Sequence, residues 1–186
     1  AVDMGYGHQR AAFPLKPFAF RGLLNANNYP GIPVSDRNRW SSGQHFYETI
    51  SRWKHLPIVG DAIFSLMDYF QRIEPFYPRR DLSTSTAQLR QFFWMIKHGW
   101  GKDLIQRLNT HALPLITTFF LPAYFAQEHG FQNDIYLVIC DADISRSWVS
   151  LFPKKSRIQY LVPNPRVKDR LKLYGVLEER IFVTGF

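Results

Sequence analysis

Residues 158–184 read IQYLVPNPRVKDRLKLYGVLEERIFVT, and this stretch decides the fold of the chain. It opens with an apolar run at 158–162, continues with a helical segment at 165–174, and closes on a second apolar run at 180–184. Asn164 is placed to cap the start of the helix. Short continuous apolar runs are typical of strands buried on both faces, so the stretch predicts two parallel strands joined by a helix.

The same alternation of strand and helix recurs on both sides of a long central segment. We therefore predict an α/β fold, with a Rossmann-like parallel sheet and helices on both faces. The predicted strands are Ala1–Met4, Gly22–Asn25 (weak), Leu115–Phe120, Ile135–Cys140, Ile158–Val162 and Arg180–Thr184. The predicted helices outside the central segment are Gln9–Phe20, Pro122–His129 and Pro165–Tyr174.

The central segment, residues 36–110, shows helical periodicity and no convincing strand. A bare loop of that length is uncommon inside a domain, so we predict a helical insert after the second strand. We expect most of its aromatic rings in the core; the alternative is an acceptor groove or a membrane-facing patch. The apolar positions that carry the periodicity are Phe46, Ile50, Trp53, Ile63, Met67, Phe70, Ile73, Phe92 and Ile96.

The composition is that of a globular protein with excess positive charge. At 186 residues, 46% hydrophobic and 20% charged, the chain fits a single domain and excludes the disordered class. A net charge of +8 suits phosphates, anionic lipid or nucleic acid as partner. Residues 111–143, however, contain four acidic residues and no Lys or Arg. We expect an acidic central segment of this kind to line a catalytic site rather than a nucleic-acid groove.

The cellular location is predicted from what the sequence lacks. Cys140 is the single cysteine, which fits a reducing compartment. The most apolar stretch, Leu113–Ala126, contains two prolines and is shorter than the roughly 20 residues of a membrane span. We expect a cytoplasmic protein, peripheral at a membrane where its cations meet anionic lipid. Because the chain starts without Met and stops on an apolar run, we also expect a fragment.

The first candidate site is Asp3-Met-Gly-Tyr-Gly-His-Gln-Arg10, between a predicted strand and a predicted helix. Gly5 and Gly7 allow the backbone to approach a ligand, and a helix N-terminus offers free N–H groups to an anion. His8 is then placed to act as a base near neutral pH; the alternative is that it only caps the helix. A dinucleotide fingerprint needs a third glycine where this chain has Arg10.

The second candidate site follows the predicted strand 135–140. Asp141 and Asp143 lie at the edge where open α/β sheets bind ligands, so either is a candidate to orient a hydroxyl, take its proton or hold a metal. The alternative is an Asp that caps the next helix. Thr118 is expected to reach the same edge, unless it is an ordinary strand threonine, and Arg146 follows just beyond.

The remaining basic and histidine residues give weaker signals. Basic residues at every second position from Arg166 to Lys172 indicate a solvated face, with phosphate or membrane contact as the alternative. We predict no metal site, because the other histidines lack metal-ligand spacing. These histidines are His45, His55, His98, His111 and His129.

Three stretches, in register, resemble one family. Residues 5–12, Gly-Tyr-Gly-His-Gln-Arg-Ala-Ala, are similar to the Gly-Gly-Gly-His-x-x-(Ala)-Ala loop of the monogalactosyldiacylglycerol synthase and lipid-II N-acetylglucosaminyltransferase group. Residues 137–141, Leu-Val-Ile-Cys-Asp, resemble that group's strand ending in Thr-Asp. Residues 160–185, ending in Val-Thr-Gly, resemble its stretch before the Thr-Gly-x-Pro junction between domains. The resemblance covers residues 1–20 and 111–186 and leaves the helical insert unmatched.

This resemblance implies a GT-B glycosyltransferase, in which two Rossmann-like domains face each other across a cleft. Residues 1–186 would form the acceptor-binding domain, inactive alone, and a donor-binding domain would follow. The implied reaction is direct displacement, which moves a sugar from a nucleotide-sugar to a hydroxyl acceptor, lipid-linked or at a membrane surface. Neither a cofactor nor a metal is required. The alternatives are a nucleotide-sugar epimerase or soluble-acceptor transferase of the same fold, and a non-enzymatic basic module that binds nucleic acid.

The resemblance also implies roles for residues at the matching positions. His8 is the expected base or acceptor orienter, with Asp141 or Asp143 as its rival. Tyr6 stands in place of the family's middle glycine, where it adds bulk or stacks on a sugar or lipid headgroup. The predicted catalytic residues are thus His8 and Asp141. The predicted substrate-binding residues are Gly5, Tyr6, Gly7, Arg10, Thr118, Asp143 and Arg146.

Overall fold

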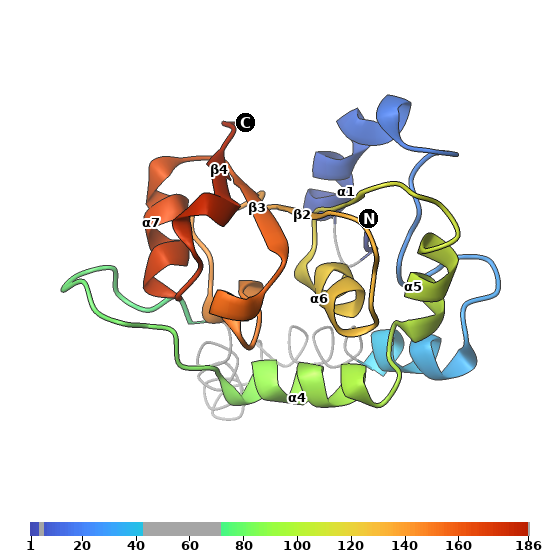
Figure 1. Cartoon of the computed structure of the whole chain (residues 1–186), viewed down its shortest axis with the longest axis horizontal. Coiled ribbons are helices and arrows are strands. Elements are labelled where there is room, and N and C mark those ends of the chain that lie inside the picture. Colours follow the sequence, from blue (N-terminus) through green and yellow to red (C-terminus); the bar gives the residue numbers. More distant parts are fainter. Residues whose placement is uncertain (4–5, 43–71, 186) are drawn as a thin grey trace, which may run out of the picture.

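The computed structural model describes residues 1–3, 6–42 and 72–185, and its centre is a four-stranded parallel sheet (Figure 1). The strands lie side by side in chain order, each parallel to the next. The α/β class with a parallel sheet is therefore confirmed. The strands are β1 (Leu115–Thr117), β2 (Ile135–Val138), β3 (Ile158–Val162) and β4 (Ile181–Val183).

The strands end where side chains or turns take over the backbone hydrogen bonds. β3 has its predicted bounds, and every second residue of it, from Ile158 to Val162, is fully buried. β1 stops before its predicted end because the Thr117 hydroxyl donates to the Phe119 carbonyl at 2.9 Å and accepts from the Phe119 amide at 3.2 Å. Phe119 is thus bonded within its own turn instead of to a neighbouring strand.

Two helices connect neighbouring strands. α7 (Pro165–Leu173) packs on β3 and β4, and the Asn164 side chain caps it by accepting from the Val167 amide at 2.9 Å. α6 (Phe120–Glu128) packs on β1 and β2. It begins two residues earlier than predicted because Pro122 is tolerated in a first helical turn, where its missing N–H has no helical partner to lose.

The two predicted N-terminal strands are wrong for residues 1–3 and 22–25, which the structure leaves without strand assignment. Ala1 does bond like a parallel partner: its amine donates to the Leu24 carbonyl and its carbonyl accepts from the Ala26 amide, both at 2.8 Å. The strand pairing ends there because the Asn27 side chain accepts from the Asp3 amide at 2.9 Å and donates to the Asp3 carbonyl at 2.8 Å.

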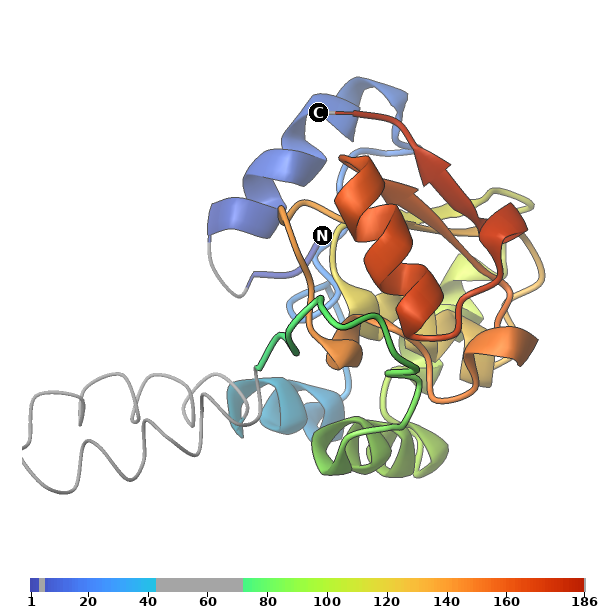
Figure 2. The same ribbon diagram turned by 90° about the vertical axis from the view of Figure 1, so that its left-hand side faces the viewer.

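The helix predicted at Gln9–Phe20 is two shorter elements. α1 (Tyr6–Ala12) is α-helical, and the 3-10 helix η1 (Phe13–Phe18) follows without a break. Pro14 and Pro17 cause the change, since neither can donate the N–H that an α-helix needs. The carboxyl end of β4, α1 and η1 all lie at one edge of the molecule (Figures 1 and 2).

The central segment is helical where the structure describes it. Residues 34–42 are helical, and α4 (Ala87–Lys97) and α5 (Lys102–Leu108) pack on α6. Within α4, Ile96 is fully buried and Phe92 partly so, as the periodicity predicts. Ile73 is the exception: it is 42% exposed and lies outside any helix. The predicted apolar positions Phe46, Ile50, Trp53, Ile63, Met67 and Phe70 lie outside the described residues.

Aromatic rings form much of the core behind the sheet. Trp100 lies 5.1 Å from Trp40 and 5.2 Å from Phe125, measured between ring centroids. Phe93 contacts Tyr124 in the same way at 5.1 Å. The rings thus join helix 34–42, α4 and the turn before α5 to α6. None of the described helices has the length and apolar character needed to cross a bilayer.

Candidate functional site

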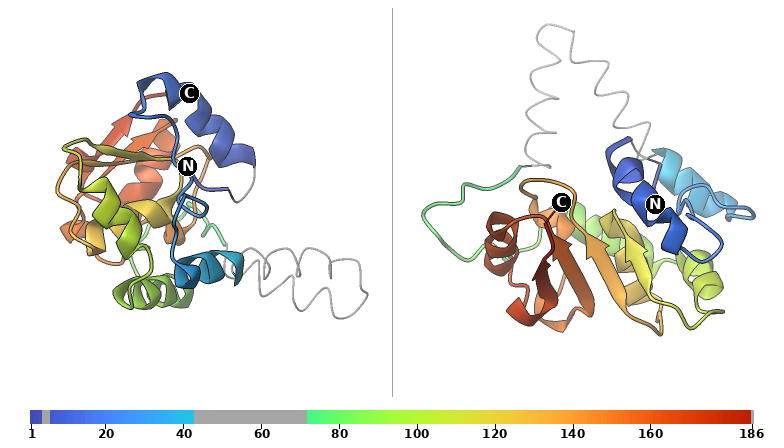
Figure 3. Two further views of the ribbon diagram at one scale, coloured as in Figure 1. Left: turned by 90° about the vertical axis from the view of Figure 1, so that its right-hand side faces the viewer. Right: turned by 90° about the horizontal axis from the view of Figure 1, so that it is seen from above.

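The candidate site lies where α1 meets the carboxyl ends of β1 and β2. The Thr118 hydroxyl, directly after β1, donates to the His8 carbonyl at 2.9 Å. Thr118 is buried, so this bond anchors the first turns of α1 to the sheet. Seen from above, α7 lies at one end of the sheet and α1 at the other (Figure 3). The bond from Thr118 therefore holds His8 at the carboxyl edge of the sheet, where the sequence predicts it.

The His8 ring packs against two aromatic side chains, which also contact each other. Its centroid is 5.0 Å from that of Phe119 and 5.6 Å from that of Trp148. Its Nδ1 atom is buried and has no hydrogen-bond partner among the described residues. Burial lowers the pKa of His8, and the Asp141 charge and the Thr118 backbone oppose this shift only in part. The ring is therefore neutral at pH 7 and able to accept a proton.

Asp141 is the carboxylate whose charge acts on His8. It follows β2 by three residues and is exposed to solvent. Its neighbour Cys140 is half-buried; burial, and then the charge of Asp141, raise the pKa of that thiol to about 11. Cys140 is thus a protonated thiol at neutral pH, and Asp141 is the charged group at this corner.

Asp143, the second predicted carboxylate, is held in an ion cluster with α7. Arg170 binds both of its oxygens at 2.9 Å, and Arg166 adds a contact at 3.2 Å. Burial acts to raise the pKa of Asp143, but Arg170, the Ile144 amide and Arg166 outweigh it and hold this pKa below its usual value. The cluster ties the loop after β2 to α7 and leaves Asp143 little capacity to serve as a base.

Arg146, predicted to bind substrate, is buried and bonded to backbone carbonyls. Its guanidinium donates to the Ser83 carbonyl through Nε at 3.0 Å and Nη2 at 2.9 Å. It also donates to the Val149 carbonyl at 2.6 Å and the Ser150 carbonyl at 3.2 Å. Burial lowers the pKa of Arg146. These four bonds account for the side chain as a link between residue 83 and the loop after β2.

The other predicted binding residues belong to α1 and the turn before it. Arg10 is exposed in the last turn of α1. Gly7 is exposed, and a Cβ added there meets no atom within 4 Å, so neither space nor a left-handed backbone requires glycine. Gly5 and the side chain of Tyr6 lie outside the described residues.

The structure therefore brings together His8, Thr118 and Asp141, whereas the charged groups of Asp143 and Arg146 are bound to other protein groups. The rings of Phe119 and Trp148 complete the site, and sequence reasoning missed their role. A signal existed for Phe119: it directly follows the two threonines at the carboxyl end of a strand, where a side chain is placed to face a ligand.

The described residues form no cluster of metal ligands, and a cavity lies away from this site. Across residues 1–3, 6–42 and 72–185, no three His, Cys, Asp or Glu side chains gather as metal ligands would. A cavity of about 690 Å³ lies elsewhere, between the turn after α7 and the loops at 79–83 and 151–155. Five Lys and Arg residues and one Asp line this basic cavity. His8 and Asp141 are not among its lining residues.

Comparisons of the chain with protein-family models, with curated proteins and with solved structures found no match. The function is therefore inferred from the residues of the site, their geometry and the sequence resemblance.

Proposed function

We propose that the chain is the Rossmann-like, acceptor-binding half of a GT-B glycosyltransferase. The observation that carries this proposal is the meeting of a neutral, half-buried His8 with the charge of Asp141 at the carboxyl edge of a parallel sheet. Open α/β sheets bind ligands at that edge. The similarity of residues 5–12, 137–141 and 160–185 to the monogalactosyldiacylglycerol synthase group supports the same assignment. The nucleotide-sugar would be bound mainly by a domain beyond this chain.

In this proposal His8 is the general base. Its neutral imidazole takes the proton of the acceptor hydroxyl while the hydroxyl oxygen attacks the anomeric carbon of the sugar. The bond from that carbon to the donor phosphate breaks, and the nucleoside diphosphate leaves with the electron pair. The imidazolium formed on His8 is stabilised by the charge of the Asp141 carboxylate.

The rings beside His8 suit an acceptor with an apolar face. Phe119 is partly exposed and offers aromatic surface of the kind that packs on a sugar ring or on the upper part of a lipid, while the buried Trp148 supports the His8 ring. Arg10, exposed on the same helix as His8, is the candidate to meet a phosphate on the acceptor. Asp143 and Arg146 are left out of the substrate contacts, because their charged groups already have protein partners.

The test is transfer activity of the full-length protein with His8→Ala and Asp141→Asn. We expect His8→Ala to lower turnover by about 10²-fold or more, the effect of a lost general base. Asp141→Asn should lower turnover less and shift the acidic limb of the pH–rate profile to lower pH, because its charge raises the pKa of His8. Asp134→Asn is the matched control: this exposed Asp lies before β2, at the opposite edge of the sheet.

Product analysis separates the enzyme classes. Formation of a glycosylated acceptor with release of nucleoside diphosphate supports the proposal, whereas an epimerised nucleotide-sugar contradicts it. Unchanged turnover in His8→Ala removes His8 from the base role. If His8→Ala and the Asp134→Asn control lose activity equally, the losses report general damage to the fold and the assignment of the site fails.

A further inference from the structure

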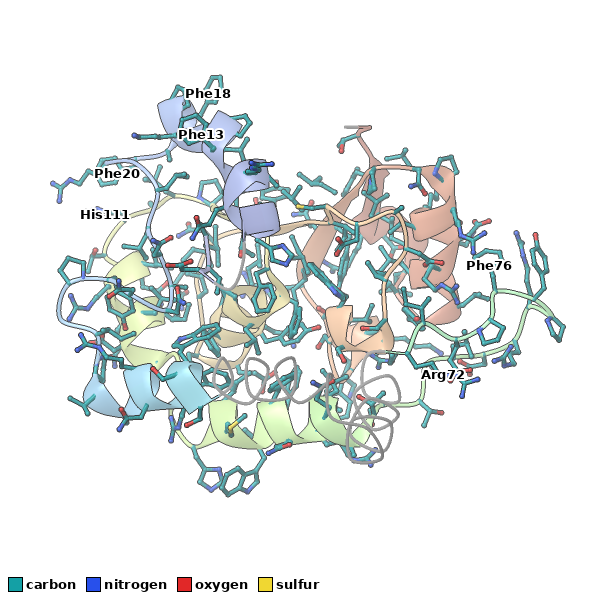
Figure 4. All side chains as sticks on the ribbon, turned by 180° about the vertical axis from the view of Figure 1, so that it is seen from behind. Phe13, Phe18, Phe20, Arg72, Phe76 and His111 are labelled. Atoms are coloured by element: carbon teal, nitrogen blue, oxygen red, sulfur yellow. The ribbon has the colours of Figure 1, made fainter. Side chains whose placement is uncertain are left out.

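Three phenylalanines project from the start of the chain at one end of the molecule. Phe13, Phe18 and Phe20 are 66%, 87% and 54% exposed, respectively (Figure 4). Single exposed apolar residues are normal on protein surfaces. Three such rings within eight residues form a patch, and apolar patches on a protein surface commonly mark a contact site.

The backbone holds this patch outward. Pro14 and Pro17 lie within η1 and restrict its backbone, and Arg21 adopts a left-handed conformation with φ of 57°. The Phe20 ring packs edge-on against His111, with 4.8 Å between ring centroids. The carbon of the Arg21 guanidinium lies over the same ring, 5.1 Å from its centroid. The three exposed rings thus lie on a segment whose backbone is conformationally restricted.

The charges around the patch have one sign. Lys16 lies among the three rings in the sequence, Arg10 precedes them and Arg21 follows them, and Asp3 is the one acidic residue in the first 35. Lys16 and Arg21 are exposed, and no ion pair within the described residues involves any of the three cations. A ring cluster of this kind with free cations is typical of segments that lie in a membrane interface.

A second set of rings and arginines shows what an internal contact looks like in the same protein. Phe76 lies about 5 Å from the guanidinium carbons of Arg166 and Arg170. Its ring is nearly buried, and both arginines are bound to Asp143. At η1 the rings are exposed and no carboxylate is bound to the cations, so an external anionic partner is the complementary surface.

We infer that η1 and the turn after it, residues 13–21, dock on an anionic lipid bilayer. The three rings enter the interface between headgroups and acyl chains, while Arg10, Lys16 and Arg21 contact lipid phosphates. The role of this docking rests on the proposed function, since it serves a transferase whose acceptor is held in the membrane. α1 runs directly into η1, so His8 lies about 8 Å along the helix from Phe13, at a rise of about 1.5 Å per residue. Docking therefore brings the site to the surface that holds a lipid-linked acceptor.

The test is sedimentation of the full-length protein with vesicles of 70% phosphatidylcholine and 30% phosphatidylglycerol. We expect Phe18→Ser to weaken binding by about tenfold, as for one aromatic ring partly withdrawn from lipid. Phe13→Ser, Phe18→Ser and Phe20→Ser together should abolish it. Lys16→Gln should weaken binding by about fivefold on these vesicles, and not on pure phosphatidylcholine.

Phe152→Ser is the matched control. Phe152 is 55% exposed and lies beside Lys154 and Lys155 at the basic cavity, and it is the one aromatic residue among those that line this cavity. Its loss should leave vesicle binding unchanged. Equal weakening by Phe152→Ser and Phe18→Ser would overturn the inference, because vesicle binding would then depend on any exposed aromatic side chain and not on this patch.

Two other occupants of the patch give distinct results. A second copy of the protein would appear as a concentration-dependent dimer that Phe18→Ser abolishes, with no binding to vesicles. Another part of the full-length protein would protect the 13–21 backbone from hydrogen exchange without lipid, again with no vesicle binding. Either result overturns the bilayer assignment. Vesicle binding is measured without substrate, so its failure leaves the transferase proposal standing, and loss of transfer in His8→Ala leaves binding intact.

Discussion

Gly101→Ala is a direct test of the packing that supports the site. Gly101 lies in the turn between α4 and α5 and has φ of 79°, in the left-handed region. A Cβ added there would lie 2.2 Å from Cγ of Phe125, a buried residue of α6. Cγ is close to the backbone and cannot swing away, so either α6 or the turn must move.

The cost has two parts, and Gly99 separates them. Gly99 lies two residues earlier with φ of 92°, and a Cβ added there meets nothing within 4 Å. Gly99→Ala should therefore cost only the left-handed strain, about 1–2 kcal/mol. Gly101→Ala carries the same strain plus the overlap with Phe125, which adds about 1–3 kcal/mol as for an overpacked core. The expected total for Gly101→Ala is about 2–5 kcal/mol.

The assay is urea unfolding of the wild type, both variants, Phe125→Ala and the double variant Gly101→Ala/Phe125→Ala. At this chain length 1 kcal/mol corresponds to about 2–4 °C in Tm, so thermal scans resolve the difference as well. In the Phe125→Ala background the overlap is gone, and Gly101→Ala should cost only about 1–2 kcal/mol. Equal losses for Gly99→Ala and Gly101→Ala in the wild-type background would refute the proposed contact between the turn and α6.

Three further predictions follow from the buried charges and the thiol. The lowered pKa of His8 means that below about pH 6.5 the unfolded chain binds a proton that the folded chain does not; the free energy of unfolding should fall as pH drops from 7.5 to 5.5, and less steeply in His8→Gln. Arg170 is 1% exposed, and Arg170→Met should cost about 2–3 kcal/mol in urea unfolding, below the usual 3–5 for a broken buried pair because Asp143 keeps Arg166 and some solvent; in an Asp143→Asn background the loss should shrink. Cys140, with its pKa raised to about 11, should react with iodoacetamide at pH 7.5 at least about tenfold more slowly than an exposed free thiol, as followed by mass spectrometry.

The sequence predicts the sheet well because its strands are decided locally. The run at Ile158–Val162 is bounded by polar and turn residues, and Asn164 caps the helix that follows, so a short window contains the whole signal. The strand predicted at Ala1–Met4 fails for the opposite reason. Its pairing ends when the Asn27 side chain occupies the Asp3 backbone, a contact between residues 24 positions apart that no local pattern reports.

The candidate site, like the fold, could be predicted from the sequence only in part. His8 and Asp141 could be expected near each other because topology alone brings the carboxyl ends of parallel strands to one edge. The bonds that occupy Asp143 and Arg146 could not be expected, because their partners lie 27 and 63 residues away in sequence. The sequence predicts Asp143 and Arg146 as substrate-binding residues beside the catalytic candidates His8 and Asp141. The hydrogen bonds of the folded chain give their charged groups protein partners instead.

The start of the chain combines a buried polar atom that lacks a partner with an exposed apolar patch. Nδ1 of His8 is one of four buried side-chain polar atoms that lack a partner among the described residues, and it is the one that lies at the candidate site. At the carboxyl edge, His8 keeps a buried Nδ1 without a partner, and Phe13 and Phe18 on the next helical segment stay in water. A ligand at His8 and a surface beneath η1 would each remove one of these costs. Because α1 runs directly into η1, docking would hold the site at the vesicle surface, and vesicles that carry a lipid-linked acceptor should lower its KM without changing kcat.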